Sequence, residues 1–152
     1  MSFAVPRRPI NAPIHKRPRV KDEPHLVFIR RLPCCVCGVP DKTEAAHVRM
    51  PSLIHGKAIS GKAQKPSDRF TVPLCNDCHR EQHGGSEEAF WSARGINAVT
   101  LSLALHGVSG DEEAGRAIVA NAIAVAPLIN GAAWHRHRRE APPMTPTFKD
   151  TT

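Results

Sequence analysis

Apolar positions along this chain are grouped into short segments separated by turn residues, a pattern that predicts several small elements rather than a few long ones. Residues 1–21 are proline-rich and show no apolar periodicity, so we expect this arm to be largely disordered. Asp22 is suited to cap a helix that runs to about Arg31, with Leu26 and Ile29 facing inward. The first ordered element is therefore expected to be a short helix.

Two later segments have the composition of strands, and a long polar loop separates them. The strands are predicted at residues 43–48 and 70–74. Between them, residues 50–69 are rich in glycine, lysine, serine and proline, which predicts a basic loop of the kind that often carries function. A helix is expected from about Asp77 to the glycine pair at 84–85. The order of strand, strand and helix predicts an α+β core.

Cap and stop residues divide the remaining ordered sequence into three further helices. Ser86, followed by two glutamates, starts one helix that Gly95 ends. Asn97 is suited to cap a second helix. Asp111 begins a third, which we expect to end at Pro127 because proline cannot donate a helical hydrogen bond.

Composition indicates a single small domain with appendages. The chain has five Phe, two Trp and no Tyr, so its aromatic core is thin, and a core of this kind commonly needs a metal ion to hold it together. We expect four parts: a disordered basic arm at 1–21, a central domain at 22–97, a helical appendage at 98–134 and a flexible tail at 135–152. The appendage helices would pack on the core or mediate self-association.

Positive charge is concentrated near the N-terminus. The net charge is +7 with histidine neutral, and residues 1–31 alone carry eight Lys or Arg against Asp22 and Glu23. Such an arm suits a polyanion such as DNA, because each phosphate that it neutralises releases condensed counterions. A solvated tail whose charge only aids solubility is the alternative interpretation.

Cysteine usage and hydropathy indicate a reducing compartment. The chain has an odd count of five cysteines and no apolar signal segment at its N-terminus, so we expect a cytoplasmic protein in a bacterial or phage-infected cell. The apolar run from Ile118 to Ile129 is short and is interrupted by Asn121 and Pro127. We therefore expect no membrane partner.

Two Cys-x-x-Cys pairs carry the strongest chemical signal. Cys34 with Cys37, and Cys75 with Cys78, each place two thiolates on a tight turn, and four thiolates complete a tetrahedral Zn²⁺ site. Buried thiols acting as small apolar groups would not explain two identical spacings. Cys35 falls outside this spacing, so we expect it to be a packed free thiol.

Histidines supply a different chemistry beside the second cysteine pair. His79 and His83 are four residues apart, so they project from the same face of a helix and can share one metal ion. His47 is isolated in the first strand, and a neutral histidine can accept the proton of an attacking water near pH 7. The structural alternatives are a helix C-cap for His83, a place in the cysteine site for His79 and a satisfied, half-buried ring for His47.

In combination, these segments resemble the HNH (ββα-metal) endonucleases. The segments that carry the resemblance are His-Leu near residue 25, Leu-Pro-Cys-Cys-Val-Cys-Gly, Ala-Ala-His-Val-Arg, Lys-Pro-Ser-Asp, Pro-Leu-Cys, His-x-x-x-His and Phe-Trp. More narrowly, they are similar to phage and prophage HNH nucleases of the type of the recombination-associated nuclease Ref. The resemblance covers roughly residues 22–97 and implies a small zinc-stapled ββα-metal core.

The resemblance also implies roles for individual residues in a metal-dependent DNA endonuclease. His47 would be the general base. Asp68, where the family usually has asparagine, would orient the His47 ring or join the metal shell, or it is an ordinary turn residue. His79 and His83 would hold the catalytic Mg²⁺, Mn²⁺ or Zn²⁺, beside the structural zinc. The expected phosphate contacts are Arg49, Lys65 and Arg69.

One departure from the family pattern keeps a second hypothesis open. Many relatives have a metal-binding Asp or His immediately before the base, whereas this chain has Ala46. The alternative is a non-catalytic, zinc-stapled DNA-binding or recombination accessory protein in which the histidines are structural.

Overall fold

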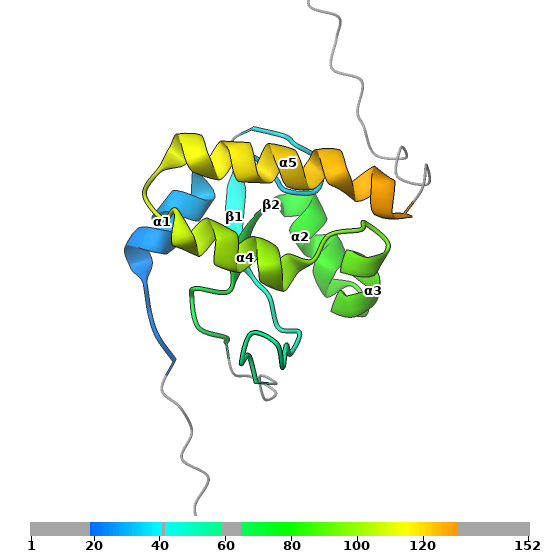
Figure 1. Ribbon diagram of the computed structural model, residues 1–152, viewed down its shortest axis with the longest axis horizontal. Helices are drawn as coiled ribbons and strands as arrows, with labels where there is room; N and C mark the ends of the chain where they lie inside the picture. The colour runs from blue at the N-terminus through cyan, green and yellow to red at the C-terminus, as the bar shows by residue number, and fades with distance from the viewer. Residues whose placement is uncertain (1–18, 41, 59–64, 131–152) are drawn as a thin grey trace, which may run out of the picture.

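The computed structural model describes residues 19–40, 42–58 and 65–130, and over these it shows a small α+β fold (Figure 1). The elements in chain order are α1 (Glu23–Arg30), β1 (Thr43–His47), β2 (Thr71–Cys75), α2 (Asn76–His83), α3 (Glu87–Ser92), α4 (Ala98–Gly107) and α5 (Glu112–Asn130). The predicted α+β class is confirmed. The predicted disorder of the arm and the tail falls almost entirely on residues 1–18 and 131–152, which lie outside the described residues.

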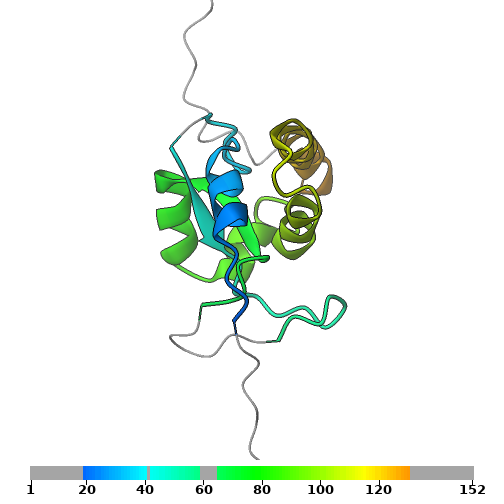
Figure 2. The same cartoon turned by 90° about the vertical axis from the view of Figure 1, so that its left-hand side faces the viewer.

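The two strands form an antiparallel hairpin in the middle of the molecule. Figure 2 shows α2 on one side of this hairpin and the α4–α5 pair on the other, with α1 packed along it. Within the described residues, none of the helices has the length and apolar character that crossing a membrane requires.

The three helix caps predicted from the sequence are confirmed, and each works by accepting a hydrogen bond from an otherwise unpaired backbone N–H. The pairs are Asp22 with the N–H of His25 (3.0 Å), Ser86 with that of Ala89 (3.3 Å) and Asn97 with that of Thr100 (3.0 Å). The first turns of α1 and α3 also carry glutamates, which the positive end of the helix dipole favours.

The last helix differs from its predicted length. α5 continues through Pro127 to Asn130, although proline removes one helical hydrogen bond. Tertiary packing explains the continuation, because Ala126 is buried and a Cβ at Gly95 would lie only 2.6 Å from the Ala126 carbonyl oxygen. Gly95 has a left-handed φ of +61°, so the turn after α3 leaves room for the end of α5.

The buried apolar residues form one cluster that runs from Phe28 in α1 to Ala126 in α5. Trp91 is its largest fully buried member. α5 approaches α1 closely at Gly115, where a Cβ would lie 2.7 Å from Phe28 and 2.9 Å from Leu32. A side chain at residue 115 would therefore force the ends of the Phe28 and Leu32 side chains to shift.

The hairpin register separates two groups of polar residues. Thr43 is opposite Cys75 at one end, and His47 is opposite Thr71 at the other. The Thr43 hydroxyl lies 2.8 Å from the carbonyl oxygens of both Arg30 and Leu32, which ties the start of β1 to the end of α1. The cysteines are therefore expected near one end of the hairpin and His47 near the other.

His25 is a buried titratable residue to which no role was assigned from the sequence. Its side chain is fully buried, its Nδ1 lies 2.9 Å from the Ser109 hydroxyl, and its Nε2 has no hydrogen-bond partner in the described part of the chain. Burial, followed by the nearby His106, lowers the pKa of His25 below its ordinary value. The folded state therefore favours the neutral ring.

We predict that the free energy of unfolding falls on acidification more steeply in the wild type than in His25→Phe. A lowered folded-state pKa means that protonation favours the unfolded chain. The stability that the neutral His25 ring contributes is thus complete above the unfolded pKa near 6.5. It is lost as the pH falls toward the folded pKa, by up to about 1.4 kcal/mol per pH unit. Urea denaturation between pH 7.5 and 5 measures it, with His55→Phe as control. Equal slopes in all three proteins would contradict the prediction.

Candidate functional site

The two Cys-x-x-Cys pairs meet in space. The sulfur atoms of Cys34, Cys37, Cys75 and Cys78 all lie within 4.8 Å of one another. The first turn closes through a hydrogen bond from the Gly38 N–H to the Cys34 carbonyl (2.9 Å), and Gly38 adopts a left-handed φ of +72°. This set could hold a metal ion such as zinc. Cys35 stays outside the set and is fully buried, as predicted.

Crowding of the four thiols perturbs their protonation. Hydrogen bonds from the thiols of Cys37 and Cys78 lower the pKa of Cys34 to about 2, while donation to Cys34 raises the pKa of Cys37 to about 11. One thiolate is thus stabilised by neighbours that keep their protons. A divalent cation would allow the remaining thiols to ionise, which is how thiolate sites bind zinc.

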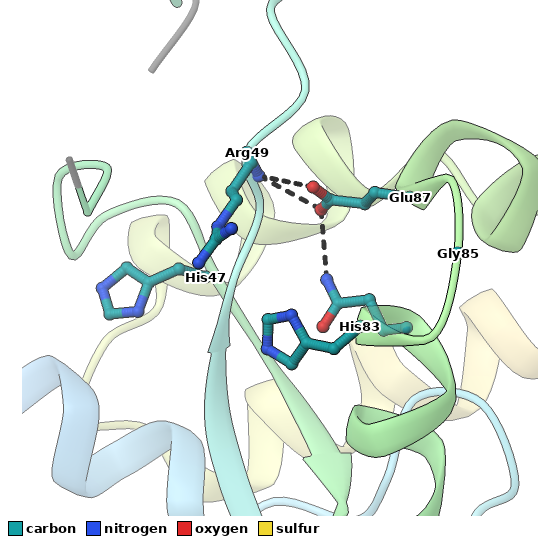
Figure 3. A pocket seen from close by; sticks show the side chains of 6 residues that line it. His47, Arg49, His83, Gly85 and Glu87 are labelled. Carbon is teal, nitrogen blue, oxygen red and sulfur yellow. Dashed lines mark hydrogen bonds between the residues drawn. The ribbon is translucent and has the colours of Figure 1, made fainter. Parts of the chain in front are cut away.

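At the opposite end of the hairpin, His47 and His83 share a cleft of about 110 Å³. It is lined by His47, Arg49, Gln82, His83, Gly85 and Glu87 (Figure 3). His47 and His83 come together because of the lengths of the two elements that carry them. α2 starts beside Cys75 and runs about 10 Å alongside β1 toward its His47 end, and β1 itself spans about 13 Å. The end of α2 therefore reaches the end of β1, with room between them for a few water molecules.

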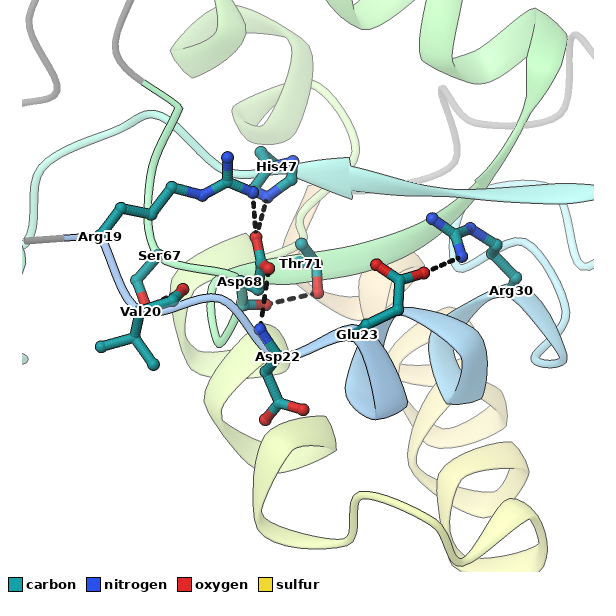
Figure 4. A network of polar contacts seen from close by, with 9 residues as sticks. All are labelled: Arg19, Val20, Asp22, Glu23, Arg30, His47, Ser67, Asp68 and Thr71. Atoms are coloured by element: carbon teal, nitrogen blue, oxygen red, sulfur yellow. Dashed lines mark hydrogen bonds and ion pairs between the residues drawn. The ribbon is translucent and has the colours of Figure 1, made fainter.

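Asp68 holds the His47 ring from the side of the long loop. The His47 Nε2 lies 2.8 Å from Asp68 Oδ1, and the same carboxylate accepts from the Arg19 guanidinium and from the Asp22 N–H (2.9 Å; Figure 4). The register explains the contact, because Thr71 is opposite His47 and its hydroxyl donates to the Asp68 carbonyl (2.8 Å). Of the three interpretations of Asp68, the contact with the ring is the one that this geometry fits.

The charge states of this pair follow from its surroundings. Burial alone would raise the pKa of Asp68, but hydrogen bonds from Arg19, His47 and the Asp22 N–H outweigh it and lower the pKa to about 2. Burial lowers the pKa of His47, against the opposing effect of Asp68. His47 is therefore neutral near pH 7. Because a carboxylate can only accept, Nε2 carries the proton and the basic lone pair is on Nδ1.

The two histidines of α2 contact each other and a glutamate on β1. The Nε2 atoms of His79 and His83 are 3.1 Å apart, and His79 Nδ1 lies 2.5 Å from Glu44 Oε2. This hydrogen bond lowers the pKa of Glu44. Among the described residues, only the four cysteines gather three or more metal-binding side chains, so the α2 pair offers two ligands and open positions.

The three basic residues expected to contact phosphate are placed differently. Arg49 lines the cleft, and Figure 3 shows its side chain pointing from the loop after β1 toward the two rings. Lys65 is exposed, and its charge contributes to lowering the pKa of His47. Arg69 is exposed but stacks its guanidinium on Phe70, 4.5 Å from the ring centre, and does not line the cleft.

Sequence reasoning missed four polar residues of the site: Arg19, Glu44, Gln82 and Glu87. Glu87 was visible only as an acidic residue at the start of a helix. In the structure its carboxylate accepts the Arg49 N–H (3.0 and 3.1 Å), the Gln82 amide (3.1 Å) and the Trp91 indole N–H (3.2 Å). It thereby holds the loop after β1 against α2 and α3. A single glutamate in a sequence has no spacing that would reveal such contacts.

We predict that Cys37→Ser lowers the bound metal well below one ion per chain, whereas Cys35→Ala leaves it unchanged. The reason is that Cys37 belongs to the cluster and Cys35 only fills the core. Elemental analysis after gel filtration measures the metal, and far-ultraviolet circular dichroism checks the fold. Loss of metal from Cys35→Ala, or full retention by Cys37→Ser, would contradict the assignment.

Comparison with known proteins gives one match. The sequence model of the family described as "Protein of unknown function (DUF968)" matches residues 7–106, which include every residue of the cysteine cluster and of the cleft. No curated protein and no solved structure matches the chain. Because the match covers well over half of the sequence, the chain belongs to the DUF968 family of proteins of unknown function.

Proposed function

We propose that this protein is a metal-dependent endonuclease of the HNH (ββα-metal) type that hydrolyses DNA phosphodiester bonds. The observation that carries the proposal is the His47–Asp68 pair at a cleft that His83 and Arg49 also line. A neutral histidine can take the proton of the attacking water, and a cation can stabilise the charge that develops on the phosphate, so this pair and a bound ion would supply the groups that the hydrolysis needs.

In the proposed reaction, His47 accepts the proton of the attacking water. Asp68 fixes the ring so that Nδ1 is the basic atom, and its negative charge stabilises the imidazolium that forms. Carboxylate–histidine pairs in other hydrolases act in the same way, with the carboxylate holding the ring and stabilising its protonated form. Arg49 would bind the phosphate oxygens, since its guanidinium can donate two parallel hydrogen bonds to them.

The α2 histidines suit the catalytic ion. Two nitrogen ligands, each about 2.1 Å from one ion, lie about 3.0–3.4 Å apart, and the His79 and His83 Nε2 atoms are 3.1 Å apart. Mg²⁺, Mn²⁺ or Zn²⁺ bound there would supply positive charge for the oxygen that leaves. The cysteine set, a four-sulfur arrangement in which Cys34 and Cys78 are buried, is the structural zinc site of the proposal.

DNA is the proposed partner because the cleft opens among cationic residues on a basic chain. Arg19 and Arg49 lie beside His47, Lys65 is close enough to lower the pKa of His47, and the whole chain carries a net charge of +7. Contacts of this kind supply affinity for any DNA sequence and weaken with salt.

A second candidate is a non-catalytic, zinc-stapled DNA-binding or recombination accessory protein. Ala46 favours it, because this residue is fully buried and apolar and offers no metal ligand next to His47. In that case the α2 histidines would be surface groups and only the cysteine set would bind metal.

We predict that His47→Ala lowers the rate of supercoiled plasmid nicking by about 10²- to 10⁴-fold, the usual contribution of a general base. The assay compares wild type and variant with Mg²⁺ or Mn²⁺, and with chelator as the blank. His55→Ala is the matched control, since His55 lies in the loop and outside the cleft lining. Equal nicking by wild type and His47→Ala would remove His47 from the mechanism.

Asp68→Asn is predicted to reduce the nicking rate and to move the acidic limb of its pH profile to lower pH. A base works only when unprotonated, so the rate falls as pH drops below the His47 pKa. Asp68 raises that pKa, and removing its charge therefore lowers the pKa further. Rates between pH 5 and 8, with zinc content as a check on folding, measure the shift. A limb that stays in place would show that Asp68 does not act on the base.

A further inference from the structure

Glu44 makes a contact that the proposed reaction leaves unexplained. Its Oε2 accepts a hydrogen bond from His79 Nδ1 at 2.5 Å, and its Oε1 lies 3.4 Å from the Asn76 amide. The carboxylate thus lies against the first two turns of α2. Because a carboxylate only accepts, His79 holds its proton on Nδ1, and its Nε2 lone pair is turned toward His83.

The position of Glu44 on β1 shows which face of the strand is turned toward α2. Side chains alternate along a strand, so Glu44 and Ala46 project to the same face of β1. This face is turned toward α2, because Glu44 contacts His79 and Asn76 of that helix. Ala46 is fully buried and has no polar atom in its side chain. Glu44 therefore provides a carboxylate to α2 from this face of the strand, two residues before Ala46.

We propose that Glu44 is a positioning residue for a divalent cation shared by His79 and His83. It fixes the tautomer and the orientation of the His79 ring, so that Nε2 is the atom available to the ion. Carboxylate, histidine and metal in this order recur in metalloproteins, where the outer carboxylate typically contributes about 10- to 100-fold in metal affinity. The inference rests on the proposed function, because it requires the second metal site.

A simple surface ion pair would behave differently. Glu44 is half exposed and its side chain could pair with a protonated His79 without any role in metal binding. Such pairs change stability slightly and leave ligand affinity unaltered. Metal affinity, rather than stability, therefore separates the two explanations.

The experiment titrates the full-length, zinc-loaded chain with Co²⁺ and follows the visible absorption of cobalt bound through nitrogen and oxygen. Glu44→Gln keeps the shape and an acceptor oxygen but removes the charge. Glu81→Gln is the matched control. Glu81 lies in α2 like the two histidines, but its carboxylate pairs with Arg94 instead of with either of them. We expect about 10- to 100-fold weaker Co²⁺ binding by Glu44→Gln and unchanged binding by the control.

The outcomes distinguish this inference from the proposed function. If Glu44→Gln binds Co²⁺ as tightly as wild type, the positioning role is overturned while the second metal site stands. If wild type binds no Co²⁺ beyond its structural zinc, the metal site itself is absent and the inference fails with it. A second readout is the His79 tautomer from nitrogen-15 chemical shifts, which should change from Nδ1–H toward a mixture in Glu44→Ala at unchanged zinc content.

Discussion

The mutual approach of four cysteine sulfurs is the constraint on which the rest of this fold depends. Four thiolates within 4.8 Å of one another repel strongly, and without a cation the Cys34 thiolate is stabilised by the thiols of Cys37 and Cys78, whose pKa values are raised. A bound ion would turn this repulsion into attraction. It would also join the turn before β1 to the end of β2 and the start of α2, in a protein whose aromatic core is thin.

α2 connects this cluster with the cleft. Its first residues follow Cys75 directly, and its last residue, His83, lines the cleft with His47. The helix is short and has no side-chain cap at its N-terminus, so its direction depends on Cys78 and on packing against the hairpin. Disturbance of the cysteine cluster would therefore be transmitted to the cleft, although no cysteine lines it.

Much of the fold and part of the site could be predicted because the relevant physics is local. Helix caps and the two cysteine spacings act over a few residues and are found as expected, and Gly84 ends α2 as predicted, whereas α3 already ends at Ser92, before Gly95. The passage of α5 through Pro127 could not be predicted, because packing against Gly95 overrides the local preference of proline. Arg19, Glu44 and Glu87 join the site through contacts 35 to 49 residues apart in the sequence, and such contacts leave no periodic signal.

The packing of α5 on α1 has a consequence for biosynthesis. Phe28 and Leu32 are covered by α5 at Gly115, and Arg31 pairs with Glu112 (3.0 Å) and accepts from Arg116 through its carbonyl (2.9 Å). The ribosome releases the hairpin and its cysteines long before this helix. Until α5 emerges, the nascent chain exposes an apolar patch on its first helix, which is the kind of surface that chaperones recognise.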